Sequence, residues 1–412
     1  MFEYESSSGF RSPPAFTKPY DSAVALFRVT IFETLMKIGV ISTLTGVSWG
    51  GSEELWATMV DEASKEGLEV AVSICHEASI PSRFPAIQHN GVRVFQRRSM
   101  LPLGRVERVL SKIASPFRET FRWKPDVICI SQGWTYETAY SSGLLDLLYN
   151  ASIPYVVVCQ FDYDDAGRGE VRDSAKYFFE RAFRVVFVSR KNLKSVERQL
   201  AHRLTNAICL QNPVNLNDLS GVPCSSSGPV SMANVARLSA AHKGQDVLLQ
   251  VLGSPIWRER DWRLRLYGAG QDGKYLAALA QHYAIADRVE FCGHVTDIRS
   301  IWQMNHLLVL PSRSEGTPLA LVEAMLCGRP AVVTDVGGNA EWIEDGQTGF
   351  VADAPTARSF GAALQRAWEA KTDWQEMGIE ARNNALAKFD KSAGKTLLKI
   401  LVDAAHQAQP KL

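Results

Sequence analysis

Residues 306–328 read HLLVLPSRSEGTPLALVEAMLCG and contain a complete strand–loop–helix unit. HLLVLPS is a short apolar run that ends near Pro311, which is typical of a strand buried on both faces. We expect Thr317 to cap the following helix and Pro318 to occupy its first position. Gly328 is expected to end that helix. The unit therefore predicts one repeat of a parallel sheet covered by helices.

The same rhythm runs through most of the chain and is interrupted once. It begins at Met36 with MKIGVIST and continues through LEVAVSIC, GVRVF, PDVICIS, IPYVVVC and RVVFVS, with helical stretches between most of them. The interruption, PVNLNDLSGVPCSSSGP at 213–229, is rich in Pro, Ser and Gly, which is typical of a linker. The rhythm restarts with VSMANVARL and continues to PAVVTD and GFVA. This duplication predicts two units of the same kind.

We therefore predict an α/β protein with two doubly wound parallel-sheet (Rossmann-like) domains facing a cleft. The predicted boundaries are an N-terminal domain at 36–213, a linker at 214–229 and a C-terminal domain at 230–385, followed by residues 386–412. Residues 1–35 are predicted to be a weakly structured N-terminal extension, because Pro, Ser and Phe alternate there without a clean period. In such sheets ligands bind outside the carboxyl ends of the strands, so the loops after strands are the candidate sites.

The composition excludes several classes of function. The 412 residues include 45 basic and 44 acidic ones, so bulk charge predicts no binding to nucleic acid. No apolar run approaches the ~18 residues of a membrane span, and the start of the chain lacks the layout of a signal peptide. Seven cysteines without a C-x-x-C pair indicate a reducing compartment and argue against a zinc knuckle. We predict a cytoplasmic protein with no metal site.

Two glutamates make the loop and helix of the opening stretch unusual. Apolar residues occupy every side of the helix, so Glu323 is expected to be a buried carboxylate, which is costly without hydrogen bonds. An ion pair with an Arg or Lys elsewhere is one interpretation, and a ribose diol is the other. Glu315 lies in the loop, beside amides of the helix N-terminus that attract anions. Because a carboxylate accepts hydrogen bonds from sugar hydroxyls, the layout predicts a nucleotide diphosphate joined to a sugar.

The first strand of the second unit is followed by basic residues, and the first strand of the first unit is followed by a glycine loop. VARLSAAHKG supplies Arg237 and Lys243, which could neutralise a diphosphate and stabilise it as a leaving group. The alternative for such a pair is ordinary surface charge. TGVSWGGSEE supplies Gly50 and Gly51, which allow backbone to approach a phosphate ahead of a helix beginning near Ser52.

Together these residues resemble glycosyltransferase family 4, retaining enzymes of GT-B architecture. The resemblance covers nearly all of 36–400 and rests on the GG loop, NPVN at 212–215, ARLSAAHKG, YGAG, the E-x-seven-E stretch and CGRPAVVTDVGGNAEWIEDGQTGF at 327–350. It implies metal-independent, cofactor-free transfer of a sugar from a nucleotide-diphosphate sugar to an acceptor hydroxyl. The acceptor would be a glycan, a polysaccharide or a lipid-linked intermediate.

The resemblance also implies roles for individual residues and domains. The N-terminal domain would face the acceptor, the C-terminal domain would bind the nucleotide sugar, and a helix at 386–412 would cross back to the first domain. Glu323 would hold the donor ribose, Glu315 the transferred sugar, and Arg237 and Lys243 the diphosphate. We place the last three at the reacting centre without naming a nucleophile. The other expected donor contacts are Gly50, Gly51, Gly268, Gly270, Gly316, Thr317, Pro318 and Leu319.

One departure from the family concerns the N-terminal domain. Family members often carry a histidine at the end of a central strand near the sugar, whereas the matching strand ends here read SQGW and CQFD. Gln132 and Gln160 take those places, and glutamine can hydrogen-bond a hydroxyl without gaining charge near neutral pH. We expect Gln160 to contact the sugar, the alternative being a glutamine that satisfies loop backbone.

GAGQDG at 268–273 supports a rival function. It fits G-x-G-x-x-G after a strand, the fingerprint of a dinucleotide-binding site, and would make the protein an NAD-dependent oxidoreductase. The motif lies after a later strand of the second unit, where a turn near the nucleotide base is the alternative. A nucleotide-sugar epimerase and a non-catalytic nucleotide-sugar binder are further alternatives on the same fold.

Two charged stretches of the first unit have alternative interpretations. DYDD at 162–165 contains D-x-D, which in a different transferase fold holds a metal, and otherwise reads as an exposed acidic loop facing the acceptor. RRSMLPLGRVERVLSKI at 97–113 places Arg105, Arg108 and Lys112 on one helical face. This face could contact an anionic membrane and hold the protein peripherally on its inner side, or it could be a solvated face.

Overall fold

The computed structural model describes residues 35–45, 49–75, 87, 91–97, 115–161, 169–223 and 228–408. The predicted N-terminal extension therefore lies outside the described residues, apart from Leu35.

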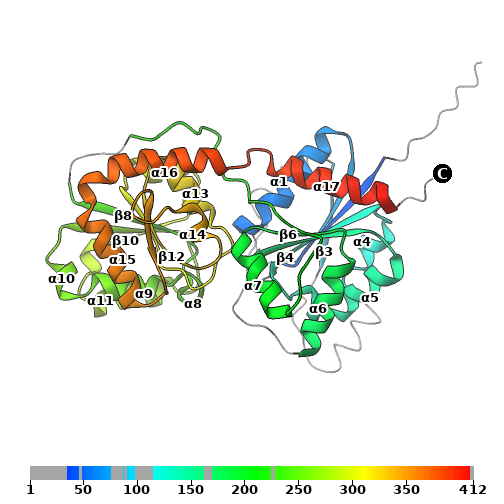
Figure 1. Ribbon diagram of the computed structural model, residues 1–412, viewed down its shortest axis with the longest axis horizontal. Helices are drawn as coiled ribbons and strands as arrows, with labels where there is room; N and C mark the ends of the chain where they lie inside the picture. Colours follow the sequence, from blue (N-terminus) through cyan, green and yellow to red (C-terminus); the bar gives the residue numbers. More distant parts are fainter. Residues whose placement is uncertain are drawn as a thin grey trace, which may run out of the picture. The chain divides into compact units, whose positions relative to one another are not determined.

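The first sheet has seven parallel strands in the order β3-β2-β1-β4-β5-β6-β7 (Figure 1). Its inner strands are almost entirely buried, as their continuous Val and Ile runs predict. The winding direction reverses between β1 and β4, so the loops after these two strands diverge at a switch point. The strands are β1 (Lys37–Ser42), β2 (Glu69–Cys75), β3 (Arg93–Arg97), β4 (Val127–Trp134), β5 (Tyr155–Phe161), β6 (Arg184–Phe187) and β7 (Ala207–Cys209).

The second sheet repeats this winding with six parallel strands in the order β10-β9-β8-β11-β12-β13 (Figure 1). Its switch point lies between β8 and β11, which pair directly with one another. The predicted fold class, two doubly wound parallel sheets, is confirmed. The strands are β8 (Val230–Val235), β9 (Trp262–Tyr267), β10 (Val289–Gly293), β11 (Leu307–Leu310), β12 (Ala331–Thr334) and β13 (Gly349–Ala352).

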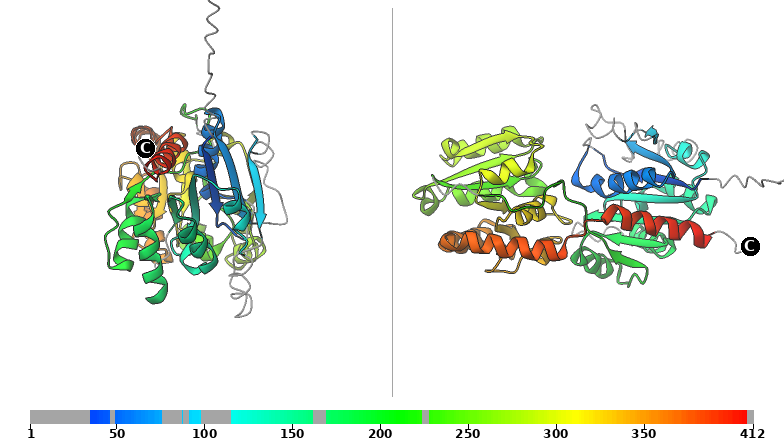
Figure 2. Two further views of the ribbon diagram at one scale, coloured as in Figure 1. Left: turned by 90° about the vertical axis from the view of Figure 1, so that its right-hand side faces the viewer. Right: turned by 90° about the horizontal axis from the view of Figure 1, so that it is seen from above.

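Helices connect the strands and cover both sheets (Figures 1 and 2). Those of the first half are the 3₁₀ turn η1 (Gly51–Glu53), α1 (Glu54–Lys65), α4 (Arg118–Arg122), η2 (Thr138–Tyr140), α5 (Ser142–Ala151), α6 (Gly169–Arg181) and α7 (Arg190–Leu200). Those of the second half are α8 (Ala240–Lys243), α9 (Gln245–Leu252), α10 (Pro255–Arg258), α11 (Gly273–His282), η3 (Ala286–Arg288), α12 (Ile298–Gln303), α13 (Leu319–Leu326), α14 (Asn339–Trp342), α15 (Ala357–Glu369), η4 (Lys371–Asp373), α16 (Trp374–Lys388) and α17 (Ala393–Ala408).

The last helix, α17, packs on the first sheet, whereas α16 before it packs on α13 of the second. Leu397 and Leu401 of α17 are fully buried in the same apolar cluster as Ile38 of β1, and α17 lies beside α1 (Figure 2). A Cβ on Gly394 would lie 2.7 Å from the carbonyl carbon of Thr58, so glycine permits this close approach of α17 to α1. The end of the chain is thus part of the first domain's core.

The segment predicted to be a linker is anchored to the second domain. Residues 214–223 and 228–229 contain no helix or strand. Val222 is buried in the core cluster of the second sheet, and its amide donates to the Cys327 carbonyl at 3.2 Å. Arg382 donates to the Leu219 carbonyl at 2.8 Å. Because these contacts hold the backbone, a movement of this segment would be transmitted to α13 and α16.

Leu401→Ala tests the role of α17. Removing a fully buried leucine leaves a cavity, so we expect the free energy of unfolding to fall by about 2–5 kcal/mol. Urea unfolding followed by circular dichroism measures this change. Lys399→Ala, an exposed position on the same helix, should change stability by less than about 0.5 kcal/mol. Equal effects of the two substitutions would show that α17 does not contribute to the core.

Candidate functional site

Most of the predicted donor residues lie at the switch point of the second sheet. Arg237 follows β8 by two residues, and Glu315 follows β11 by five. Because β8 and β11 are neighbouring parallel strands, the loops after both leave the same edge of the sheet. This is the position at which doubly wound sheets bind ligands.

Lys243 and Glu315 form an ion pair at this edge. The lysine ammonium lies 2.7 Å from Glu315 Oε1, and the Ser312 hydroxyl donates to the same oxygen at 2.7 Å. Glu315 is 6% exposed, so its carboxylate depends on these partners. Gly244, at φ +64°, brings the lysine here, because a Cβ there would lie 2.0 Å from the Pro311 carbonyl oxygen. The structure thus joins two residues that lie 72 positions apart.

Arg237 remains open to solvent beside this pair. Its side chain is exposed and makes no hydrogen bond or ion pair within the described ranges. The pKa of His242 is lowered, first by burial and then by the charges of Arg237 and Lys243. Both cations therefore act on one imidazole, which places two positive charges at one end of the sheet. Such an arrangement attracts an anion.

Glu323 is buried on α13 and contacts the connection between the domains. It is 3% exposed and accepts a hydrogen bond from the Asn215 amide at 3.0 Å. Burial raises the pKa of Glu323 to about 7; the Asn215 amide lowers that pKa, and the charge of Glu54 raises it. Over the described ranges no Lys or Arg pairs with Glu323, so the ion-pair interpretation finds no support there. The carboxylate instead binds backbone of the NPVN segment.

The helix start predicted for the loop was wrong by one residue. α13 begins at Leu319, with Pro318 as its N-cap, and the Thr317 side chain does not cap it. The Thr317 hydroxyl donates instead to the Val188 carbonyl at 2.9 Å, a tertiary partner that local sequence does not reveal. The predicted end is confirmed, because Gly328 follows the helix at φ +79°.

Glycines bring backbone of the first domain against the α13 loop. A Cβ on Gly316 would lie 1.9 Å from the Gln160 carbonyl oxygen at the end of β5. A Cβ on Gly51 would lie 3.1 Å from Leu319 Cδ1. Gly50 is the N-cap of η1, so the expected helix near Ser52 starts as a 3₁₀ turn that runs into α1. The predicted glycine loop thus meets the first residue of α13.

The two glutamines at strand ends differ in how their side chains are satisfied. Gln132 Nε2 donates to the Thr135 carbonyl at 2.5 Å, and Gln132 Oε1 accepts from the Thr138 amide at 3.3 Å, so its own loop satisfies it. Gln160 Oε1 accepts from Asn212 Nδ2 at 2.8 Å. Gln160 Nε2 and Asn212 Oδ1 are buried without a partner. These two atoms can hydrogen-bond a ligand, a role of Asn212 that its sequence position after β7 alone did not indicate.

The glycines of GAGQDG serve packing between neighbouring loops. A Cβ on Gly268, at φ +133°, would lie 2.2 Å from the Ala236 carbonyl oxygen, and one on Gly270 would lie 2.2 Å from that of Leu238. The motif follows β9, the neighbour of β8, and so stands one strand away from the switch point. A dinucleotide fingerprint would follow β8. The two glycines therefore support the loop that carries Arg237.

Sequence reasoning missed a set of contacts between the start of α7 and the segment that follows β12, including α14. The Glu341 carboxylate accepts from the backbone amides of Arg190 at 3.2 Å and Lys191 at 2.7 Å, at the N-terminus of α7. The Lys191 ammonium lies 2.6 Å from Asp335 Oδ1. These bonds join the two domains beside Gly316 and Thr317, and no local pattern marked them because the partners lie about 150 residues apart in the chain.

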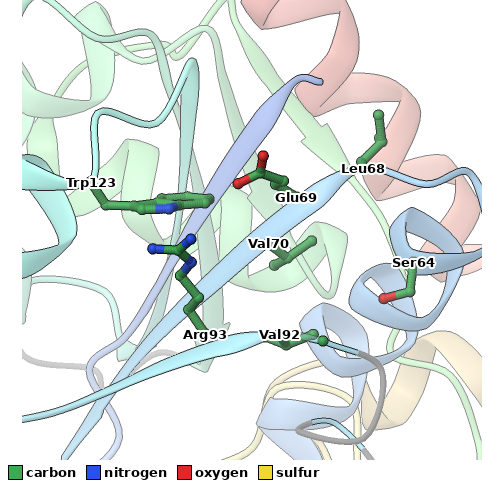
Figure 3. Close-up of a pocket in the computed structure, with 8 residues that line it drawn as sticks. Ser64, Leu68, Glu69, Val70, Val92, Arg93 and Trp123 are labelled. Carbon is green, nitrogen blue, oxygen red and sulfur yellow. The ribbon is translucent and has the colours of Figure 1, made fainter. Parts of the chain in front are cut away.

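A cavity of about 100 Å³ lies at the opposite end of the first sheet (Figure 3). Glu69 and Arg93 open β2 and β3, and their side chains lie beside the Trp123 ring (Figure 3). This cavity is at the amino ends of the strands and contains no predicted site residue.

Some predicted features cannot be placed. DYDD at 162–165 and residues 98–113 of the basic stretch lie outside the described residues. Within the described ranges, no group of three or more His, Cys, Asp or Glu side chains is arranged to hold a metal ion. No helix among those ranges is both long and apolar enough to cross a membrane.

Part of the second half of the chain is similar to known proteins. Residues 230–370 match the family model described as glycosyl transferases group 1. An uncharacterised glycosyltransferase of Haemophilus influenzae is 26% identical over 50% of this chain and 58% of its own length. An alpha-D-kanosaminyltransferase of Streptomyces kanamyceticus is 28% identical over 56% of each chain. The chain spans about half the length of the curated relatives it matches.

Solved structures share the fold across both domains. HepE of Anabaena, solved with UDP-glucose, superposes with a TM-score of 0.69 at 19% identity, covering 90% of this chain and 100% of its own. Sucrose-phosphate synthase of Thermosynechococcus elongatus superposes with a TM-score of 0.71 at 18% identity, covering 91% of this chain and 100% of its own. The predicted GT-B architecture is confirmed.

Glu323→Gln tests the cost of the buried carboxylate. The pKa of Glu323 is about 7 in the folded protein, against an ordinary value of 4.5, so the unfolded chain ionises this carboxyl group at a lower pH than the folded protein does. The free energy of unfolding of the wild type therefore falls as the pH rises from 4.5 to 7. Glutamine cannot ionise and can still accept from Asn215. We expect the variant to gain about 2–3 kcal/mol relative to wild type between pH 5 and pH 8, measured by urea unfolding.

The matched control is Glu380→Gln, an exposed position on α16, where the same exchange removes no buried carboxylate. If Glu323→Gln and wild type showed parallel pH profiles, Glu323 would be ionised at no cost, and an unrecognised cation would have to pair with it.

Proposed function

Because residues 230–370 match the model of the group 1 glycosyl transferases, we propose that this protein is a retaining, metal-independent glycosyltransferase. It moves a sugar from a nucleotide-diphosphate sugar to an acceptor hydroxyl on a glycan, polysaccharide or lipid-linked intermediate. The observation that carries the proposal is the Lys243–Glu315 ion pair, with Arg237 beside it, at the switch point of the second sheet.

The ion pair would be exchanged when the donor binds. A diphosphate offers Lys243 and Arg237 more negative charge than Glu315 does, and the amides at the start of α13 add to the attraction. Once Lys243 turns to the diphosphate, Glu315 Oε1 keeps only the Ser312 hydroxyl. That oxygen is then free to accept a hydrogen bond from a hydroxyl of the transferred sugar.

Glu323 would take the ribose of the nucleotide. A ribose diol donates two hydrogen bonds to a carboxylate, which lowers the pKa of the carboxyl group from about 7 and favours its ionised form. Glu323 also accepts a hydrogen bond from the Asn215 amide. Binding of the ribose to Glu323 would therefore affect the backbone that connects the two domains. On the other side, Gln160 Nε2 and Asn212 Oδ1 would meet hydroxyls of the sugar.

The chemical step needs negative charge to be absorbed on the leaving group. The acceptor oxygen forms a bond to the anomeric carbon while the bond from that carbon to the diphosphate oxygen breaks and its electron pair goes to the diphosphate. Arg237 and Lys243 stabilise the charge that develops there. The acceptor proton passes to the departing diphosphate oxygen on the same face of the sugar, which retains the anomeric configuration.

A panel of metal-free thermal shifts tests the donor class. UDP, GDP, ADP, their common sugar conjugates, NAD and NADP would each be added to the full chain. A ligand at about 100 times its dissociation constant stabilises by about 2.7 kcal/mol. We expect one nucleoside diphosphate and its sugars to raise the melting temperature selectively. A shift produced by NAD alone would contradict the proposal.

Lys243→Met and Glu315→Gln separate the two halves of the ion pair. We expect Lys243→Met to weaken binding of the nucleoside diphosphate and of its sugar conjugate about 10- to 100-fold, because a charge-assisted bond to phosphate is lost. Glu315→Gln should not weaken binding of the diphosphate alone, because it removes the carboxylate that competes for Lys243, and it should slow hydrolysis of the donor in the absence of acceptor about 100-fold. Isothermal titration and release of nucleoside diphosphate measure these effects.

Arg358→Ala, an exposed cation on α15, is the control for loss of one positive charge and should change neither quantity. If Lys243→Met bound the diphosphate as tightly as wild type did, the pair would be a structural contact and the assignment of the leaving-group site would fail.

A further inference from the structure

A second cluster of buried polar groups lies at the switch point of the first sheet. Ser42, which ends β1, donates to Glu53 Oε2 at 2.6 Å. Thr43 donates to Glu137, and the Gly133 amide donates to the same oxygen of Glu137 at 2.9 Å. Since a carboxylate accepts about four hydrogen bonds, both glutamates retain capacity for a ligand.

Arg97 reaches this cluster from the end of β3. Its Nη2 donates to the Ser42 carbonyl, and its guanidinium lies 5.0 Å from the centre of the Phe117 ring. Arg97 is 4% exposed, and its Nε and Nη1 are buried without a hydrogen-bond partner. Across the described ranges it forms no ion pair, although Cys75, Glu53 and Glu137 all lie close enough to act on its charge. A buried guanidinium with two nitrogen donors that lack an acceptor is costly, so we expect a ligand to accept hydrogen bonds from them.

The cluster borders the loop that carries the proposed donor residues. Gly51 and Glu53 belong to the same 3₁₀ turn, and Gly51 lies against Leu319, the first residue of α13. A group bound by Glu53 and Arg97 would therefore lie on the first-domain side of that loop.

The charges of the cluster discriminate between kinds of ligand. Two carboxylates face one guanidinium, so the net charge is negative when both are ionised and zero when one is protonated. Burial raises the pKa of Glu53 and of Glu137 to about 7, and burial lowers that of Arg97 to about 10. As long as at least one of the two carboxylates is ionised, the cluster has no net positive charge and does not attract an anion. A hydroxyl suits the site because it donates to a carboxylate and accepts from a guanidinium at the same time.

Resting on the proposed function, we propose that Glu53, Arg97 and Glu137 form the acceptor subsite and bind an uncharged sugar through its hydroxyls. Trp134, which ends β4, lies beside Tyr140, with ring centres 5.4 Å apart, and Tyr140 is 48% exposed. The two rings offer an apolar surface to the C–H face of a sugar whose hydroxyls reach Glu137. The three charged residues are positioning groups for the acceptor, and none of them belongs to the proposed donor site.

The experiment uses simple acceptors with the full chain and saturating donor. The uncharged probes are p-nitrophenyl glycosides of glucose, galactose, mannose and N-acetylglucosamine. The charged probes are p-nitrophenyl glucuronide and glucose 6-phosphate. Release of nucleoside diphosphate above the rate without acceptor is measured. We expect at least one uncharged glycoside to accelerate release and the charged probes to be without effect.

Variants then test the residues against the accelerating glycoside. Glu137→Gln and Arg97→Lys should each raise the KM for that glycoside about 10- to 100-fold, because hydrogen bonds to charged groups are lost. The dissociation constant of the nucleoside diphosphate should not change, which also shows that each variant is folded. Glu170→Gln, an exposed position on α6, should change neither value. If Arg97→Lys fails to fold, Glu137→Gln and Glu53→Gln still decide the question.

The outcomes separate this proposal from the one on which it rests. Suppose that the wild type binds the donor normally. The acceptor subsite alone would then be overturned if no uncharged probe accelerated release, if only charged probes did so, or if the variants left the KM for the glycoside unchanged. Absence of nucleotide-sugar binding in the wild type would overturn both proposals.

Discussion

The parallel pairing of β8 with β11 is the constraint on which the candidate site depends. It aligns Met232 with Leu307 and Ala233 with Leu308, so the loops after two strands that are far apart in the chain emerge side by side. That alignment places Lys243 against Glu315. A one-residue slip would also turn the apolar side chains of a buried strand to the wrong face, so burial of the core and geometry of the site are held by the same register.

Close backbone contact joins the two domains at the same edge. Gly316 lies against the Gln160 carbonyl, Thr317 donates to Val188, and Glu341 accepts from the amides that begin α7. On the first-domain side every one of these contacts is made by a backbone group, which cannot change rotamer, so together they hold the α13 loop against the first sheet. The Glu323–Asn215 bond adds a direct link from that helix to the connection between the domains.

The buried carboxylates of the two domains fall into two groups, according to whether a cation pairs with them. Glu315 has a lysine 2.7 Å away, whereas Glu53, Glu137 and Glu323 depend on hydroxyl and amide donors and have pKa values raised to about 7 by burial. A paired carboxylate is stable without a ligand. The other three are costly in the free protein, and the hydroxyls of sugars and ribose are the ligands that would offset that cost.

The local sequence determined the strands, the repeated winding and the burial of Glu323, because these depend on spacing and on which side chains avoid water. It also determined that a glycine, Gly328, follows α13, because that position has a positive φ. Only the tertiary structure decided the rest. The Thr317 hydroxyl donates to the Val188 carbonyl and does not cap α13. The Gln132 side chain hydrogen-bonds its own loop, whereas Gln160 Nε2 is buried without a hydrogen-bond partner. Arg97 lies two strands from Ser42, and no sequence spacing encodes that approach, because a hydrogen bond between distant segments depends on the positions of both backbones.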